Sequence, residues 1–207
     1  MSELEFSLRK ACDAAGSAEE AVKIRRREGH VFGSPPGDPK AIIRAIGRGP
    51  GKGLAMPLGG TVQLAIAERL IEAGQPVASS YLIAFRFAFG GQIAPYWDKP
   101  KNKGNVPPFN AKTDRTFGRL FSIGRTWLVV APGASGLPGD DGFTYFSDDP
   151  AYQFDGRTFD GLNSVALSVG EPVDGKPRIL LNISDVCRNL ADNLDVPFSE
   201  FCGETAK

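Results

Sequence analysis

The residues of this chain best suited to chemistry are cations gathered near its amino end. From Lys23 to Lys52 the sequence carries eight Lys or Arg residues and two acids. Guanidinium and ammonium groups bind phosphate oxygens, and an arginine can also bridge the two acceptors on a guanine edge. The pattern therefore predicts a surface for a polyanion, with double-stranded DNA as the expected partner. The candidate DNA-binding residues are Lys23, Arg25, Arg26, Arg27, Arg44, Arg48 and Lys52.

Charge is also divided along the whole chain of 207 residues. Residues 1–125 hold 19 Lys or Arg and 11 Asp or Glu, whereas residues 126–207 hold 5 and 13. A formal net charge of zero therefore hides a basic half followed by an acidic half. This asymmetry favours nucleic acid or an anionic surface as the partner of the first half. An acidic second half that covers the basic half, in the same molecule or a neighbour, is an alternative role for the charge.

Two short helices are expected to position the first of these cations. Apolar residues recur every three or four positions from Leu4 to Ala15, which predicts a first helix that ends at Gly16. A second helix is expected from Ala18 to Glu28, with the aliphatic stem of Arg25 turned toward the first helix and with Lys23, Arg26 and Arg27 facing outward. Two helices joined by a tight glycine turn are typical of a helix-turn-helix.

A capping signal precedes the second helix. Ser17 is followed three residues later by Glu20, which is the spacing of a capping box. In that motif the serine hydroxyl accepts a hydrogen bond from an early helix amide, and the carboxylate accepts one from the serine amide. The sequence therefore predicts Ser17 and Glu20 as helix-capping residues, with the same amide groups available to a phosphate.

The region after the second helix is expected to form a wing. His30 to Phe32 predicts a short strand, and Leu54 to Leu58 predicts the strand that returns. Between them, Pro39 to Ile46 predicts a short helix, and the run of Gly, Arg and Lys from Gly47 to Gly53 predicts a loop.

The rest of the chain predicts two helices, a linker and a small sheet with a terminal helix. The helices run from a Thr61 cap to Ala73 and from Val77 to Phe89, and residues 91–117 are rich in Pro, Lys and Asn. Strands and a final helix follow. Their expected ranges are residues 126–131, 143–146, 164–169 and 178–183 for strands, and Ser184 onward for the helix.

These elements define an α+β fold of two domains. Residues 1–90 are expected to form a winged helix-turn-helix DNA-binding domain, and residues 91–117 a linker. Residues 118–207 are expected to form a small α+β domain for oligomerisation or partner binding, with an antiparallel sheet and a terminal helix.

Enzyme and metal chemistry find little support. The chain has one histidine, His30, and three cysteines at wide spacing, so a Ser-His-Asp site, a zinc site and a disulfide scaffold are not expected. Cys12 and Cys187 are expected to be small buried residues on helix faces. The loop that includes Lys52 lacks the glycine and the Ser or Thr that a phosphate-binding Walker loop requires. No catalytic residue, metal or cofactor is predicted.

The first ninety residues resemble the winged helix-turn-helix domain of the MerR-like regulators and related phage and mobile-element proteins. The likeness covers less than half the chain. The segments that carry it are Phe6 to Ala11, Ser17 to Gly29 and Ala65 to Gly74. The insert in the wing is longer here, no long helix for dimerisation follows Phe89, and a cysteine-rich effector loop is missing.

The resemblance implies roles for the cations. In that family the second helix reads the major groove and the wing contacts the flanking backbone or minor groove. Arg26 and Arg27 would then meet guanine edges or phosphates, and Lys23 would lie near the face that enters the groove. The remaining cations of the wing would serve phosphates.

Together these observations predict a sequence-specific DNA-binding transcription regulator that acts as a homodimer in the cytoplasm. No stretch is apolar and long enough for a membrane span, and the amino end lacks the pattern of a secretory signal. The alternative is a non-enzymatic phage structural or interaction protein that assembles through its basic and acidic halves.

Overall fold

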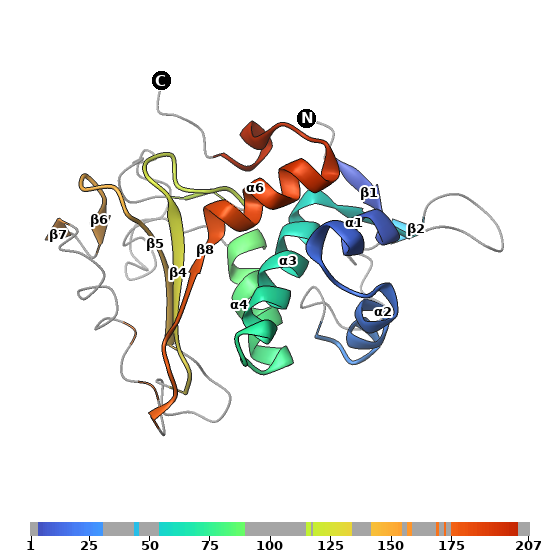
Figure 1. Cartoon of the computed structure of the whole chain (residues 1–207), viewed down its shortest axis with the longest axis horizontal. Helices are drawn as coiled ribbons and strands as arrows, with labels where there is room; N and C mark the ends of the chain where they lie inside the picture. Colours follow the sequence, from blue (N-terminus) through green and yellow to red (C-terminus); the bar gives the residue numbers. More distant parts are fainter. Residues whose placement is uncertain are drawn as a thin grey trace, which may run out of the picture. The chain divides into compact units, whose positions relative to one another are not determined.

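The structure is a computed structural model, and its elements appear in Figure 1. It describes residues 4–30, 44–45, 54–89, 115–116, 118–133, 142–154, 157–158, 169, 172 and 175–202. The chain is a mixture of helices and small antiparallel sheets, as the sequence predicted for the fold class. It divides into two compact units. Unit 1 comprises Met1–Phe89 and Asp185–Phe198, and unit 2 comprises Gly90–Ser184 and Ser199–Lys207.

Unit 1 combines helices with a three-stranded antiparallel sheet of order β1-β3-β2. Its elements in chain order are β1 (Glu5–Ser7), α1 (Leu8–Ala15), α2 (Glu19–Arg27), β2 (Arg44–Ala45), β3 (Leu54–Pro57), α3 (Leu58–Glu72) and α4 (Val77–Phe89), joined by the part of α6 (Ile183–Leu194) that follows Ser184.

The first helix is shorter than the sequence pattern predicts. The segment from Leu4 to Ser7 was expected to be helical, but Glu5–Ser7 is strand β1, which pairs with β3. The side chain of Ser7 then caps α1, since its hydroxyl accepts a hydrogen bond from the amide of Lys10 at 3.2 Å. Ladder bonds to β3 and this cap together explain why the helix begins at Leu8.

The structure differs from the predicted wing in the strand that pairs with β3. Arg44 and Ala45, expected in a helix, form β2, whose residues pair with Ala55 and Leu54 of β3. Strand β3 runs beside this segment and offers backbone amides and carbonyls for hydrogen bonding. The segment pairs with these groups, and it is therefore a strand and not a helix. The strand predicted from Leu54 onward is confirmed as β3, whereas the strand expected at residues 30–32 lies outside the described residues apart from His30, which belongs to no element.

The core of unit 1 is built on α3 and α4, which lie side by side in Figure 1. Helix α3 is buried on nearly all sides, as its apolar sequence leads one to expect. It begins at Leu58, three residues before the predicted Thr61 cap, because Pro57 ends β3 and the chain turns directly into the helix. The Thr61 hydroxyl instead donates to the carbonyl of Pro57 at 3.2 Å.

Unit 2 contains a sheet of order β5-β4-β8 and a small two-stranded sheet. Strands β4 and β5 pair in register from Thr126 with Ser147 to Ala131 with Gly142. The predicted strands at 126–131, 143–146 and 178–183 are thereby confirmed, and the one at 164–169 lies outside the described residues except for Val169. The elements of unit 2 are β4 (Thr126–Ala131), β5 (Gly142–Ser147), β6 (Gln153–Phe154), β7 (Arg157–Thr158) and β8 (Ile179–Asn182), and the short 3-10 helix η3 spans Phe198–Phe201.

Arg115 belongs to the core of unit 2, although the sequence placed it in a linker of residues 91–117. Its side chain is buried, with 1% exposed. Its guanidinium lies 5.3 Å from the ring centroid of Tyr145 and donates to the carbonyl of Arg119 at 3.2 Å. A packed, hydrogen-bonded arginine of this kind is a core residue and not part of a linker.

The terminal helix α6 packs with unit 1, whereas the sequence placed it in a domain of residues 118–207. Two polar contacts join it to α1. The ammonium of Lys10 donates to the carbonyl of Leu194 at 2.9 Å, and the amide of Asn193 donates to the carbonyl of Ala14 at 3.2 Å. A lysine at the carboxyl end of a helix satisfies a carbonyl that the helix leaves open and complements its dipole.

The three cysteines form no disulfide and differ in exposure. Cys12 and Cys187 are buried with 0% exposed, which confirms the prediction, and Cys202 is exposed. Burial, followed by the charge of Glu19, raises the pKa of the Cys12 thiol from 9.0 to about 12. At neutral pH this thiol is therefore both inaccessible and un-ionised.

We expect a thiol reagent at neutral pH to modify one cysteine per native chain, and all three after denaturation. The labelled peptide, identified by mass spectrometry, should contain Cys202, and Cys202→Ser should abolish the native reaction. Raising the pH to 9 should leave Cys12 unmodified, because its pKa lies well above that value. Rapid native labelling of Cys12 would contradict the packing of α1.

Candidate nucleic-acid interface

Helix α2 carries the basic run that the sequence singled out, and its charge order stabilises the helix. Glu19 and Glu20 lie in the first turn, and Arg25, Arg26 and Arg27 lie in the last. Acids at the amino end and bases at the carboxyl end both complement the helix dipole. The helix ends where predicted, within one residue, and it presents its cations at its carboxyl end.

The predicted capping box is wrong. Helix α2 begins at Glu19 after Ala18, and no side chain caps it. The hydroxyl of Ser17 instead donates to Oε1 of Glu68 on α3 at 3.1 Å, and the carboxylate of Glu20 binds Lys23 at 2.7 Å. A buried carboxylate across the interface is a stronger partner for the hydroxyl than a backbone amide.

Arg25 belongs to a polar cluster between α2, α3 and α4 that is centred on Glu68. Its guanidinium forms an ion pair with Glu68, and the same nitrogen lies 3.3 Å from the hydroxyl of Tyr81. The Tyr81 hydroxyl donates to Glu68 at 3.3 Å, so that Ser17, Arg25 and Tyr81 all meet one carboxylate oxygen. We call these four residues the Glu68 cluster.

The Glu68 cluster is withdrawn from solvent. The side chains of Arg25 and Glu68 are 19% and 11% exposed, and Tyr81 is 1% exposed. Burial raises the pKa of the Tyr81 hydroxyl above its usual range, so it stays protonated as a donor. Burial opposes the charge of Arg25, yet its hydrogen bond to Tyr81 and the charge of Glu68 outweigh that cost and raise the pKa of the guanidinium.

The structure therefore corrects the role of Arg25. The sequence grouped it with the DNA-binding cations, but its guanidinium is engaged inside unit 1 by Glu68 and Tyr81. It holds α2 against α3 and α4, and its charge is paired with Glu68. Sequence reasoning missed Glu68 and Tyr81, because nothing local marks an acid 43 residues away as the partner of an arginine.

Lys23 keeps part of its side chain in solvent but is already paired. Its ammonium lies 2.8 Å from Glu19 and 2.7 Å from Glu20, and 32% of its side chain is exposed. These contacts raise the pKa of Lys23 and lower that of Glu20. Two carboxylates compensate this cation locally, which makes Lys23 a weaker candidate than the sequence implied.

Arg26 and Arg27 are exposed. Within the part of the chain that the structure describes, neither forms an ion pair with a carboxylate within 4.0 Å. Their positions differ, because successive helical residues are 100° apart. Arg27 shares the outward face with Lys23, whereas Arg26 lies one turn after the buried Val22, at the edge of that face.

The cations of the predicted wing are only partly described. Arg44 lies on strand β2, and its backbone pairs with Ala55 of β3. Arg48 and Lys52 lie outside the described residues. Of these three residues the structure therefore describes Arg44 alone, by its backbone. Arg44 lies on β2, which pairs with β3, and both strands follow α2 in the chain.

An apolar side chain shares the outward face of α2. Ile24 is 51% exposed, although it lies two residues from the buried Val22. Two residues correspond to 200° around a helix, so the two side chains lie on nearly opposite sides. Helical periodicity alone could have identified Ile24 as the apolar member of the exposed face, and the sequence analysis overlooked it.

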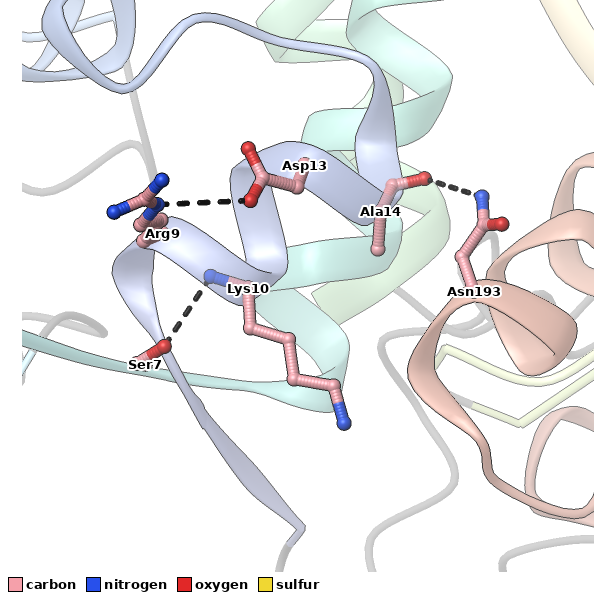
Figure 2. A pocket seen from close by; sticks show the side chains of 6 residues that line it. All are labelled: Ser7, Arg9, Lys10, Asp13, Ala14 and Asn193. Carbon is pink, nitrogen blue, oxygen red and sulfur yellow. Dashed lines mark hydrogen bonds and ion pairs between the residues drawn. The ribbon is translucent and has the colours of Figure 1, made fainter.

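A hollow in unit 1 lies between α1 and α6 (Figure 2). It has a volume of about 440 Å³ and is open to solvent. Its polar groups are engaged with one another, since Arg9 pairs with Asp13 at 3.9 Å and the Lys10 amide donates to Ser7. The hollow is therefore a junction between two helices of unit 1, and these contacts lie along its wall. Its lining residues are Ser7, Arg9, Lys10, Asp13, Ala14 and Asn193.

The described residues define an α+β chain whose first unit presents a basic helix to solvent. No protein-family model matches the chain, and no curated protein is significantly similar to it. No helix in the described ranges is long and apolar enough to cross a membrane. Among the same residues, no group of three or more His, Cys, Asp or Glu side chains gathers as a metal site.

Proposed function

We propose that this protein is a sequence-specific DNA-binding transcription regulator and that α2 is its recognition helix. The observation that carries the proposal is the division of the three arginines of α2. Arg25 anchors the helix through the Glu68 cluster, while Arg26 and Arg27 extend into solvent. A helix fixed on one side and cationic on the other is suited to entering a major groove.

The anchoring matters because α2 has little apolar contact of its own. Val22 is its one buried residue, so apolar packing fixes the rotation of the helix only weakly. The Glu68 cluster adds directional contacts from α3 and α4 to Arg25 and Ser17. With this rotation fixed, Arg27 faces outward and Arg26 flanks it, as base contacts and backbone contacts require.

The order of the elements in unit 1 supports a winged helix-turn-helix. Strand β1 precedes α1 and α2, the pair β2 and β3 follows them, and β3 lies between β1 and β2 in the sheet. In the proposed complex β2 and β3 form the wing. Arg44, Arg48 and Lys52 then contact phosphates beside the groove that α2 enters. A homodimer that reads a two-fold operator in the cytoplasm completes the proposal.

Replacing Arg26 and Arg27 together by alanine should weaken binding to duplex DNA and flatten its dependence on salt. Each lost phosphate contact removes about one unit of the slope of log affinity against log salt. We expect roughly a tenfold loss of affinity or more at low salt, measured by fluorescence anisotropy with a random-sequence duplex.

The matched control removes two exposed arginines from other helices of unit 1. Arg69→Ala with Arg86→Ala changes the net charge equally, and both side chains are exposed on α3 and α4. This control should retain most of the affinity. Equal losses in the two variants would show that net charge alone matters and would reject α2 as the interface. No duplex binding by the unaltered protein, together with large assemblies in light scattering, would favour the structural-protein alternative.

A further inference from the structure

We infer that Ile24 is a specificity-determining residue that contacts the methyl group of a thymine in the DNA major groove. The inference rests on the proposed function, since it assigns the base that the outward face of α2 reads. Ile24 is the most exposed of the large apolar side chains among the described residues, with 51% of its surface in solvent. It contributes little to the core of unit 1, yet it lies among the cations of the proposed interface.

The position of Ile24 on α2 places it beside Arg27. The two residues are three apart, so they are neighbours on the helix surface, with about 5–6 Å between their Cβ atoms. Neighbouring base pairs are about 3.4 Å apart along the duplex axis. Ile24 and Arg27 can therefore address base pairs one or two steps apart. Glu20 lies one turn before Ile24, and its carboxylate pairs with Lys23 at 2.7 Å.

The chemistry of the major groove selects thymine for an apolar side chain. Of the four bases, thymine alone presents a methyl group there, whereas the other groups on the base edges are hydrogen-bond donors or acceptors. A branched aliphatic side chain offers no hydrogen bond and gains by excluding water from that methyl. The guanidinium of Arg27 matches the O6 and N7 acceptors of guanine, so the pair together reads a thymine close to a guanine.

Charge favours DNA over a second copy of this chain as the occupant of the face. Ile24 is flanked by Arg27, which is exposed, whereas Arg26 lies two residues from Ile24 on nearly the opposite side of the helix. Two copies meeting through this face would bring like charges together, which opposes association. A duplex brings phosphates to the same arginine while its groove covers the apolar side chain.

The test begins with selection from a pool of random-sequence duplexes by the full chain, by Ile24→Ala and by Leu82→Ala. Leu82 is the matched control, because it is 50% exposed on α4, away from the proposed interface. The unaltered protein and Leu82→Ala should enrich the same motif, containing a thymine near a guanine. Ile24→Ala should enrich the guanine while losing the preference for thymine.

A second measurement removes the methyl group from the DNA. Replacing that thymine by deoxyuridine in the selected duplex should weaken binding of the unaltered protein about fourfold, the effect expected for one buried methyl. The same replacement should leave binding by Ile24→Ala unchanged. An unchanged thymine preference in Ile24→Ala, or equal binding of thymine and deoxyuridine duplexes by the unaltered protein, would overturn the inference while leaving DNA binding intact. Failure of the unaltered protein to enrich any duplex would instead reject the proposed function.

Discussion

Replacing Glu68 by alanine is expected to lower the free energy of unfolding by about 3 kcal/mol or more. The carboxylate of Glu68 meets Arg25, Ser17 and Tyr81, and it lies in a site where the side chains of the ion pair are less than one fifth exposed. Its removal leaves the guanidinium of Arg25 partly buried without an anion. Urea denaturation followed by circular dichroism at 222 nm measures the loss.

The same helix offers a matched control for this prediction. Glu72 also pairs with an arginine, Arg69, at 2.7 Å, but the two side chains are 56% and 46% exposed. A solvent-exposed pair of this kind contributes at most about 1 kcal/mol, so Glu72→Ala should change stability little. Equal effects of Glu68→Ala and Glu72→Ala would show that the Glu68 cluster is not the anchor of α2.

Glu68→Gln separates the charge of the cluster from its shape. The amide keeps the size of the side chain and one acceptor oxygen, but it removes the negative charge opposite Arg25. We expect an intermediate loss of stability. If the proposed function is correct, this variant should also weaken DNA binding although it alters no residue of the outward face, because the rotation of α2 depends on the cluster.

The second large effect is expected in unit 2, where Gly124→Ala should lower the free energy of unfolding by about 3 kcal/mol. Gly124 has a φ of +62°, and a Cβ built there would lie 2.5 Å from Oγ of Ser147 and 2.6 Å from the amide nitrogen of Asp149. The hydroxyl of Ser147 is itself held by the carbonyl of Ile123 at 2.5 Å. The added methyl group therefore displaces a hydrogen-bonded corner.

Gly175→Ala is the control for Gly124→Ala. Gly175 lies in the same unit with a φ of +66°, but a Cβ built there meets nothing within 4 Å. Gly175→Ala should therefore lower the free energy of unfolding only by the strain of the left-handed backbone, about 1–2 kcal/mol. Trp127 lies on β4 in unit 2, so its fluorescence follows the unfolding of that unit. Equal losses in the two variants would contradict the tight packing around Gly124.

Local patterns identified most of the regular structure correctly. Helices α2 and α4 and strands β3, β4, β5 and β8 have bounds within a few residues of the predicted ones. Periodicity, glycine stops and runs of β-branched or aromatic residues determine such elements over a few neighbouring positions. Side-chain exposure on α2 followed from the same periodicity, which is why Arg26 and Arg27 are exposed as expected.

Contacts between distant segments account for what the sequence did not predict. Strand β1 forms at Glu5–Ser7 because β3, some fifty residues later, pairs with it. Ser17 and Arg25 turn away from their predicted roles because Glu68 on α3 offers a buried charge. A local contact such as a helix cap contributes only about 1 kcal/mol. A buried carboxylate from a distant segment binds these side chains more strongly, so the long-range contact forms instead.

The sequence by itself determined the α+β class, the uneven distribution of charge, and most of the helices and strands, but not the strands β1 and β2. The tertiary structure alone decided that Glu68 and Tyr81 are the partners of Arg25, and it assigned α6 from Asp185 onward to unit 1. The physical reason is that periodicity depends on neighbours along the chain. The fate of a charged side chain depends on whether folding brings it an opposite charge in a place that water does not reach.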